Sequence, residues 1–268
     1  MNFQKVRVYK QIIKTGIIRS LTYKFHVYSN ILMQVIIMAC SACFWKALFR
    51  NTDTLKGVNV DTMLVYTVIS SVISIVLSSD VEWRIMKCVE KGTIAIDMIR
   101  PVNPFSIYFA EDIAAVISLF FQNIIPILII ASLIIGVPAP VSLNAFLLFV
   151  VSLVMAYVIN WFIAVLFGMI SFSAIQISSL FQVKKHLIRL LSGSIIPIWF
   201  FPGWLRNILS ALPFAYLYQL PLDIYIGKAT GEEIVKGLAV QFIWMIVLAG
   251  LFLYCEKRVQ KKIMVQGG

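Results

Sequence analysis

The sequence predicts an all-α protein that crosses a membrane several times, and two observations on composition support this class. Hydrophobic residues make up 60% of the 268 residues and charged residues only 13%, whereas a soluble domain carries about 25% charged residues. The mean hydropathy is +0.92, and the apolar residues lie in long runs with few charges, as membrane helices require. These features exclude a large soluble core. We therefore expect one membrane domain over residues 1–268.

Six apolar segments reach or approach the roughly 20 residues that a helix needs to cross a bilayer. The second is short and rich in Ser and Thr, the fourth is long enough to tilt, and the fifth is interrupted by Pro197 and Pro202. The predicted spans are residues 27–49, 62–79, 113–136, 145–172, 187–201 and 234–254.

The basic residues predict the orientation of these spans. With the N-terminus inside, 17 of the 23 basic residues lie on the cytoplasmic side, as the positive-inside rule requires. Both termini are then cytoplasmic, and the net charge of +11 reflects loops that face anionic membrane lipid. We expect no nucleic-acid partner. The expected location is a cell membrane, with the bacterial cytoplasmic membrane favoured.

Two further segments are predicted to be helical without crossing the membrane. Residues 1–26 carry an apolar stripe flanked by lysines, which predicts an interfacial helix in the inner headgroup layer and no cleavable signal peptide. Residues 201–231 are apolar but broken by Pro202, Pro213 and Pro221. This pattern favours short re-entrant helices on the extracellular side, because a seventh span would place the basic C-terminal tail outside.

A strongly polar island between the second and third spans is predicted to begin as a helix. Ser79 and Glu82 have the spacing of a capping box, and Asp80 is spaced to pair with Arg84 one turn later. Gly92 is suited to end the helix after about twelve residues. A helix of this length is too short to cross a bilayer.

The cytosolic loop covers residues 80–104, and the part after Gly92 is predicted to bend back toward the membrane. Arg100 precedes Pro101 and therefore avoids helical backbone, and Pro104 suits the start of the next helix. The island carries both signs of charge: Asp80, Glu82, Glu90, Asp97, Arg84, Lys87, Lys91 and Arg100. A lipid-binding helix has a basic polar face, so the balance favours a protein partner, with a helix resting on lipid as the alternative.

Taken together, this layout resembles the permease subunit of an ABC-2-type ABC exporter, in the branch with a VEW…G…RPVN cytosolic loop. The layout covers the whole chain, and the loop motif covers about 25 residues. The residues that carry the motif are Val81, Glu82, Trp83, Ile85, Gly92, Ile94, Ile99, Arg100, Pro101, Val102 and Asn103.

The resemblance implies a coupling helix at residues 80–92, seated on a separate ATP-binding subunit, with residues 1–26 as a connecting helix beside it. It implies two permease chains per transporter, identical or paralogous, and two ATP-binding subunits. The residues assigned to coupling are Asp80, Glu82, Trp83, Arg84, Ile85, Glu90, Gly92, Arg100 and Pro101.

The sequence contains no nucleotide-binding motif of the form GxxxxGK[ST]. We therefore expect no enzymatic activity and no cofactor on this chain, with ATP and Mg held by the partner subunit. Cys40 and Cys43 have CxxC spacing but lie within an apolar run, and His26 and His186 are isolated. A metal site needs more ligands than these, so no metal is expected.

Six polar or aromatic residues near or within the spans are candidates for a pathway or gate: Glu111, Asp112, Gln122, Asn123, Asn160 and Trp161. The two carboxylates form either a gate or a proton-linked pair near the pathway, or an interfacial pair facing water or the coupling elements. The two amides before Pro126 line a path or bond carbonyls that the proline leaves unpaired. Asn160 and Trp161 either pack against another helix or contact the substrate.

The leading function is thus the membrane subunit of an ATP-driven exporter, which forms the translocation path. Two alternatives come from other classes. A stand-alone secondary carrier requires coupling-ion groups at the bilayer midplane, and a lipid-modifying membrane enzyme requires clustered His, Asp or Glu side chains. The sequence supplies neither feature and does not identify the substrate.

Overall fold

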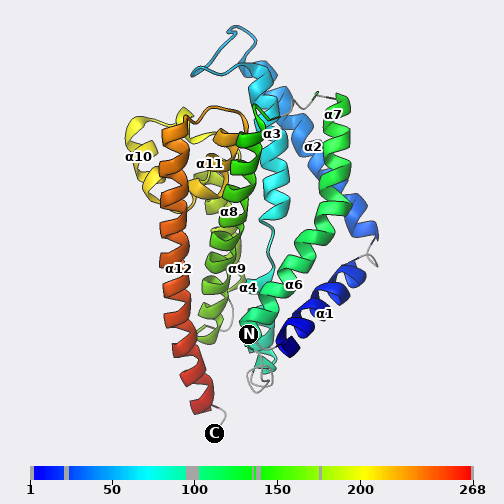
Figure 1. Ribbon diagram of the computed structural model, residues 1–268, viewed down its shortest axis with the longest axis vertical. Helices are drawn as coiled ribbons and strands as arrows, with labels where there is room; N and C mark the ends of the chain where they lie inside the picture. The colour runs from blue at the N-terminus through cyan, green and yellow to red at the C-terminus, as the bar shows by residue number, and fades with distance from the viewer. Residues whose placement is uncertain are drawn as a thin grey trace.

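The computed structural model describes residues 3–20, 24–94, 103–134, 136, 140–174 and 177–266. Within these residues the chain is helical and contains no β-strand; Leu55 and Val58 form an isolated bridge in the loop that follows the second helix. Most helices run along the long axis of the molecule and form a bundle (Figure 1). The prediction of an all-α class is confirmed.

Five helical segments of the described chain are long and apolar enough to cross a membrane. They are Val27–Leu48, Val60–Glu90, Pro104–Ile134, Leu143–Phe172 and Gly231–Gln260. The predicted span at residues 187–201 is not among them. There, α9 (Ser178–Leu191) ends, Gly193 has φ of +85°, and the chain resumes as a 3-10 turn, η3 (Ile198–Phe200). Glycine at positive φ and the following Pro197 interrupt the helix.

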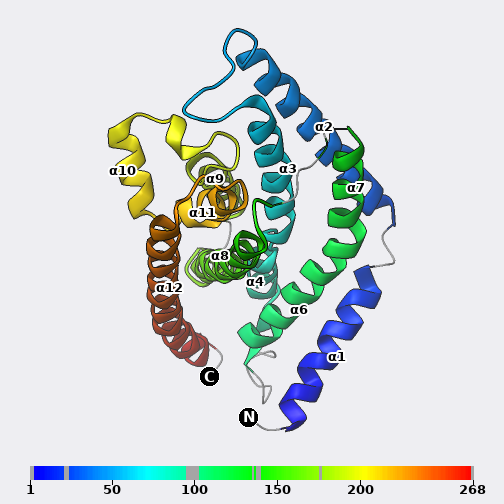
Figure 2. The same cartoon turned by 45° about the horizontal axis from the view of Figure 1, so that its top comes forward.

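The N-terminal helices cover one side of the bundle. Helix α1 (Phe3–Ser20) runs alongside α6 (Pro104–Leu119) (Figure 2). A Cβ atom on Gly16 would lie 2.8 Å from the Cβ of Ala114, so glycine allows the two backbones to approach closely. Helices α2 (Lys24–Leu48) and α3 (Val60–Val76) pack against each other. Helix α4 (Val81–Glu90) follows at the same end of the bundle as α1 (Figure 1).

The third membrane segment starts earlier than predicted. Asn103 caps α6 by accepting a hydrogen bond from the Phe105 amide at 2.8 Å, and Pro104 occupies the first turn, so the helix begins at residue 104 rather than 113. Helix α6 continues through a π-helical turn, η1 (Phe120–Ile124), into α7 (Ile125–Ile134). Pro126 cannot donate a backbone hydrogen bond, which accounts for the π turn and the change of direction visible there (Figure 1).

Helices α8 (Leu143–Met169), with its final 3-10 turn η2 (Ile170–Phe172), and α12 (Gly231–Gln266) form the other side of the bundle. Gln241 of α12 is fully buried. Its Nε2 donates to the Ser152 carbonyl at 2.8 Å and to the Tyr216 carbonyl at 3.0 Å. One buried amide therefore joins α12 to α8 and α11 (Ala215–Tyr225).

Two short helices, α10 (Gly203–Ala211) and α11, lie toward the end of the bundle opposite α4 (Figure 1). A buried polar group supports them, and we call it the outer cluster. Its members are Tyr66, Gly193, Trp199, Gln219 and Asp223.

Hydrogen bonds within the outer cluster connect α3, the break after α9 and α11. The Tyr66 hydroxyl donates to the Gly193 carbonyl at 2.6 Å. Gln219 accepts from the Ile198 amide at 2.7 Å and donates to Asp223 at 2.8 Å. These bonds satisfy backbone groups that the interrupted helix leaves unpaired.

Candidate functional site at α4

The C-terminal end of α4 lies where the sequence predicts it, whereas the N-terminal end is capped differently from the prediction. Gly92 has φ of +69°, directly after the C-cap, which confirms the predicted helix stop. The helix has ten residues. The reciprocal capping box does not form, because Asp80 is the N-cap and Glu82 pairs with Lys184. The Ser79 Oγ does accept a long hydrogen bond, 3.4 Å, from the Val81 amide, and it donates to the buried carboxylate of Asp112, a charged acceptor that forms a stronger bond than an amide does.

One face of α4 lies against α8. Val81 is 1% exposed and Ile85 is fully buried. At the contact point, a Cβ atom on Gly168 would lie 2.8 Å from the Ile85 Cδ1 and 3.0 Å from the Glu82 Cα. The absence of a side chain at Gly168 therefore allows α4 to lie directly on α8.

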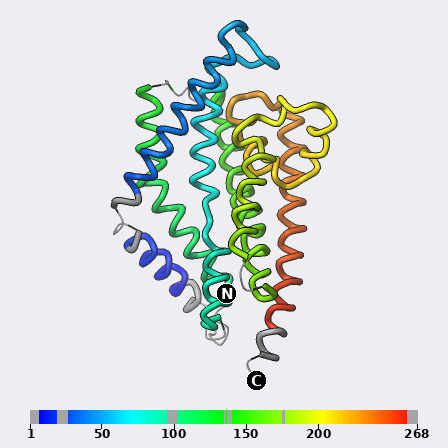
Figure 3. The backbone as a smooth tube through the Cα atoms, turned by 180° about the vertical axis from the view of Figure 1, so that it is seen from behind, coloured from blue at the N-terminus to red at the C-terminus, as the bar shows by residue number. Residues whose placement is uncertain are grey.

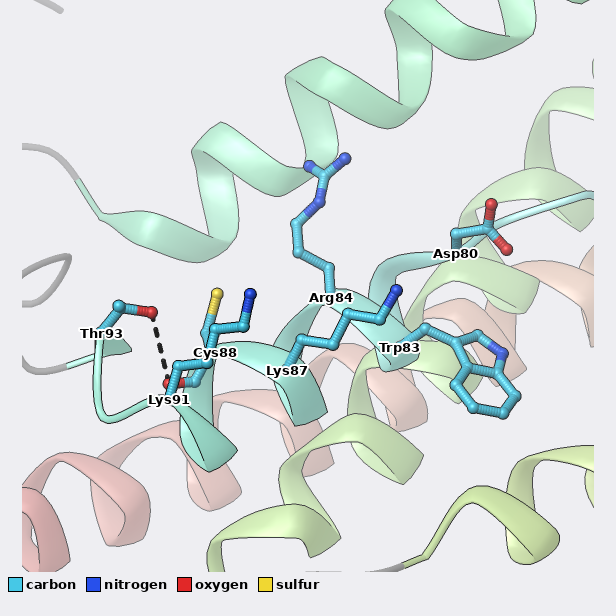
Figure 4. A pocket seen from close by; sticks show the side chains of 7 residues that line it. All are labelled: Asp80, Trp83, Arg84, Lys87, Cys88, Lys91 and Thr93. Atoms are coloured by element: carbon cyan, nitrogen blue, oxygen red, sulfur yellow. Dashed lines mark hydrogen bonds between the residues drawn. The ribbon is translucent and has the colours of Figure 1, made fainter.

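Arg84 pairs with Glu111 of α6, and not with Asp80 as predicted. Arg84 also lies over the Tyr108 ring, with Cζ 5.6 Å from the ring centroid. Figure 4 shows the Arg84 side chain extending from α4 toward the neighbouring helix. Both charged side chains are more than a third exposed. This pair joins α4 to the start of the third membrane segment.

A second ion pair joins α4 to α9 and was not predicted. Glu82 pairs with Lys184, and both residues are buried. The Lys184 ammonium also lies 5.7 Å from the centroid of the Phe167 ring. Burial lowers the pKa of Lys184, against the opposing attraction of the Glu82 carboxylate. A usable signal was present in the sequence, since Lys184 lies on the buried stripe of α9 with Phe181 and Ile188.

Aromatic contacts reinforce the junction of α4 and α9. The rings of Trp83 and Phe181 meet edge to face, with centroids 5.2 Å apart, and Met86 packs in the same hydrophobic cluster. We call the polar groups around α4 the inner cluster; they are Ser79, Glu82, Arg84, Glu111, Asp112 and Lys184.

The outward face of α4 borders an open hollow of about 700 Å³. Its lining is mostly polar and basic (Figure 4): Asp80, Trp83, Arg84, Lys87, Cys88, Lys91 and Thr93. Lys87 and Lys91 are exposed, as is Glu90 beside them. α4 therefore presents a charged surface to the outside while its other face is buried. The predicted coupling residues Arg100 and Pro101 lie outside the described residues.

The six candidate pathway residues serve different parts of the molecule. Glu111 and Asp112 contact Arg84 and Ser79 respectively, so both carboxylates face α4 and the residues just before it. Asn160 donates to the carbonyl of Leu77, the C-cap of α3, at 2.7 Å. This bond joins α8 to the end of α3.

The remaining candidates are buried to different degrees. Trp161 packs against Phe109, with ring centroids 4.9 Å apart. Asn123 is 2% exposed in the π turn, and its amide has no hydrogen-bond partner within the described residues. Gln122, next to it, is half-buried.

Comparison with known protein families adds an independent finding. A family model described as ABC-2 family transporter protein matches residues 35–262. The chain belongs to the ABC-2 transporter family. The match runs from α2 to near the end of α12 and includes α4 and the whole outer cluster. A search of curated proteins finds no matching relative.

Family membership and the five apolar helices make the chain a multi-pass membrane protein. ABC-2 membrane proteins generally work with ATP-binding subunits. Within the described part of this ABC-2 protein, no three His, Cys, Asp or Glu side chains gather as candidate metal ligands.

Proposed function

We propose that this ABC-2 protein is the permease subunit of an ATP-driven exporter, and that a separate ATP-binding subunit acts on α4. The geometry of α4 is the observation that supports the proposal. The helix is buried on α8 through Val81 and Ile85, while Lys87, Glu90 and Lys91 face outward. A short helix held on one side and charged on the other is suited to receive force from a soluble partner.

The proposed topology has six crossings, with both termini in the cytosol. Helices α8 and α12 end near α4: Gly168 contacts Ile85, and Asn103, just after the α4 loop, donates to Glu256 of α12. Between them the chain must return once to the opposite end. In our proposal residues 187–201, which are the C-terminal end of α9 and the break after it, make this interrupted crossing, and α10 and α11 lie in the outer leaflet.

Three contacts would carry movement of α4 into the bundle. They are the close approach to Gly168 in α8, the Arg84–Glu111 pair to α6 and the Glu82–Lys184 pair to α9. Glu82 is buried and is therefore assigned a positioning role, with the partner subunit contacting the exposed residues. The proposed transporter contains two ATP-binding subunits that hold ATP and Mg, a second permease that is identical or paralogous, and surrounding lipid.

Copurification of charge-reversal variants tests this proposal. Glu90→Lys and Lys87→Glu alter the outward face of α4 without touching its buried face, and we expect each to reduce recovery of the ATP-binding subunit several-fold. Lys257→Glu is the matched control, because Lys257 is exposed on the part of α12 that extends past Glu256. Absence of any ATP-binding subunit from the wild-type preparation would contradict the proposal.

A further inference from the structure

Residues 77–80 connect α3 to α4 and lie outside both helices; we call them the linker. They form the short stretch of cyan tube without helical turns near the middle of Figure 3. The Leu77 carbonyl accepts a hydrogen bond from Asn160 of α8 at 2.7 Å, and the Ser79 hydroxyl donates to Asp112 of α6. Side chains of two membrane helices therefore hold the linker just before α4 begins.

The carboxylate of Asp112 is buried and needs a hydrogen-bond donor. Asp112 is 6% exposed, and a buried carboxylate without a donor or a nearby positive charge is strongly destabilising. Ser79, which belongs to the linker, supplies a donor in this structure. Movement of α4 that pulls the linker away would withdraw Ser79 from Asp112. A second donor is then required to keep the carboxylate satisfied.

The Tyr157 hydroxyl of α8 is available as that second donor. Its oxygen is buried and has no hydrogen-bond partner within the described part of the chain. The charge of Asp112 acts on this hydroxyl, so the two groups are close enough to interact electrostatically. A buried hydroxyl that lacks a partner is unfavourable, and such a group in a native protein calls for a specific explanation.

Aromatic packing sets the level of Tyr157 along α6. The centroid of the Phe109 ring lies 6.1 Å from that of Tyr157 and 4.9 Å from that of Trp161. Asp112 lies about one turn after Phe109, and Tyr157 lies one turn before Trp161. Helix α6 begins near α4 whereas α8 ends near it, so both steps lead away from α4. The carboxylate and the hydroxyl are therefore at one level of the bundle.

We propose that Asp112 changes its hydrogen-bond donor when α4 moves, from Ser79 in the linker to Tyr157 in α8. The inference rests on the proposed function, because it assigns one structural step to the force that the ATP-binding subunit applies to α4. Tyr157 is a positioning residue, and it is paired only after the linker has been released. The carboxylate has a donor in both arrangements, so neither arrangement leaves a buried charge unpaired. Two discrete arrangements of this kind can transmit movement between distant parts of a protein.

The first test measures the thermal unfolding midpoint in detergent when Tyr157→Phe is introduced into the wild type and into Ser79→Ala. In the wild type the Tyr157 hydroxyl is unpaired, so we expect its removal to leave the midpoint unchanged or to raise it. In Ser79→Ala the carboxylate has to use Tyr157, so the same removal should lower the midpoint by about 3–6 °C. The effect of one substitution then depends on the other, which defines a coupled pair.

Tyr218→Phe is the matched control, because this buried hydroxyl donates to Ser74 at 3.2 Å. We expect it to lower the midpoint by about 2–4 °C in both backgrounds alike. A loss in Tyr157→Phe that is equal in the two backgrounds would show that its hydroxyl is already bonded, for example to a water molecule, and would overturn the proposal. A neutral effect in both backgrounds would overturn it as well. These measurements need no ATP-binding subunit, so such a result would leave the proposed function intact.

The second test follows the linker during ATP hydrolysis. The chain is copurified with its ATP-binding subunit, and amide hydrogen exchange at residues 77–81 is compared before and after trapping with ATP and vanadate. We expect the exchange rate to increase several-fold in the wild type and in Tyr218→Phe. The increase should be much smaller in Tyr157→Phe, because Asp112 then has no donor to replace Ser79. An unchanged rate in a wild-type complex that hydrolyses ATP would overturn the proposed change of donor and leave the permease assignment standing.

Discussion

The inner cluster around α4 and the outer cluster below α10 use different chemistry to join helices. In the inner cluster, side chains with full charges pair across helices, as in Arg84–Glu111 and Glu82–Lys184. In the outer cluster, Tyr66 and Gln219 bond to backbone groups, and the carboxylate of Asp223 accepts from the neutral side chains of Trp199 and Gln219. Charged side chains can exchange partners when helices move, whereas side-chain bonds to backbone groups hold the break after α9 in one conformation. The contrast suggests a movable end and a rigid end of one bundle.

The largest effect is expected from breaking the buried pair of the inner cluster. Lys184→Met leaves the Glu82 charge buried without its partner, which should lower the free energy of unfolding by about 3–5 kcal/mol. Thermal unfolding in detergent measures this change. In the double variant Glu82→Leu/Lys184→Met no charge remains buried, so stability should recover most of the loss. Equal instability of the single and double variants would argue against this account.

The same pair predicts a dependence on pH. In Glu82→Gln the attraction that opposes the lowered pKa of Lys184 is removed, so the folded state favours the neutral amine. The unfolded chain then binds more protons than the folded chain, and stability rises with pH. We expect the unfolding midpoint of Glu82→Gln to increase from about pH 7 to about pH 9, relative to wild type. Unfolding midpoints that change with pH in the same way in Glu82→Gln and in the wild type would contradict the prediction.

The outer cluster should show the next largest effect. Gln219→Leu removes the acceptor of the Ile198 amide and a donor to Asp223, at a cost of about 3 kcal/mol in the free energy of unfolding. Asp223→Asn is the milder companion, because an amide oxygen can still accept from Trp199 and Gln219. If the hydrogen bonds of the outer cluster keep the break after α9 rigid, their loss in Gln219→Leu should increase amide hydrogen exchange at residues 192–200. An unchanged exchange rate at these residues would contradict the difference in rigidity between the inner-cluster and outer-cluster ends of the bundle.

A smaller effect is expected where α4 crosses α8. Gly168→Ala introduces a Cβ atom 2.8 Å from Ile85 and 3.0 Å from the Glu82 backbone, and such overpacking costs about 1–3 kcal/mol. Gly250→Ala is the control, since its added Cβ would meet no group outside its own stretch of helix within 4 Å. In an α-helix that change should leave stability unchanged or raise it slightly. Similar losses in both variants would show that the contact has no special role.

The smallest effect on stability is expected from the partly exposed pair. Arg84→Gln removes an ion pair whose side chains are 37% and 38% exposed, so the loss should be below about 1 kcal/mol and should shrink further in high salt. Its effect on ATP-driven transport should be larger than its effect on stability, because the pair joins α4 to α6. A comparison of transport rate and unfolding midpoint in one preparation checks this order.

The sequence predicted the helical class, most of the apolar segments and the stop at Gly92, because these depend on local composition and backbone preference. It also identified Glu111, Asp112 and Asn160 as candidates for a pathway or gate, with an interfacial pair or helix packing as the alternatives. It did not identify Lys184, Gln219 or Asp223. The i and i+4 spacing of Gln219 and Asp223 in an apolar helix was a signal that could have found the outer cluster.

Only the tertiary structure decided which groups meet. Ser79 and Arg84 had suitable partners within their own helix, yet they bond to Asp112 and Glu111 of α6. The apolar run at residues 187–201 was long enough to suggest a span, but its break is stabilised by Tyr66 from another helix. Hydrophobic segments are a property of the chain itself. The partners of buried charges and amides depend on how helices cross, since a hydrogen bond requires contact between groups far apart in sequence.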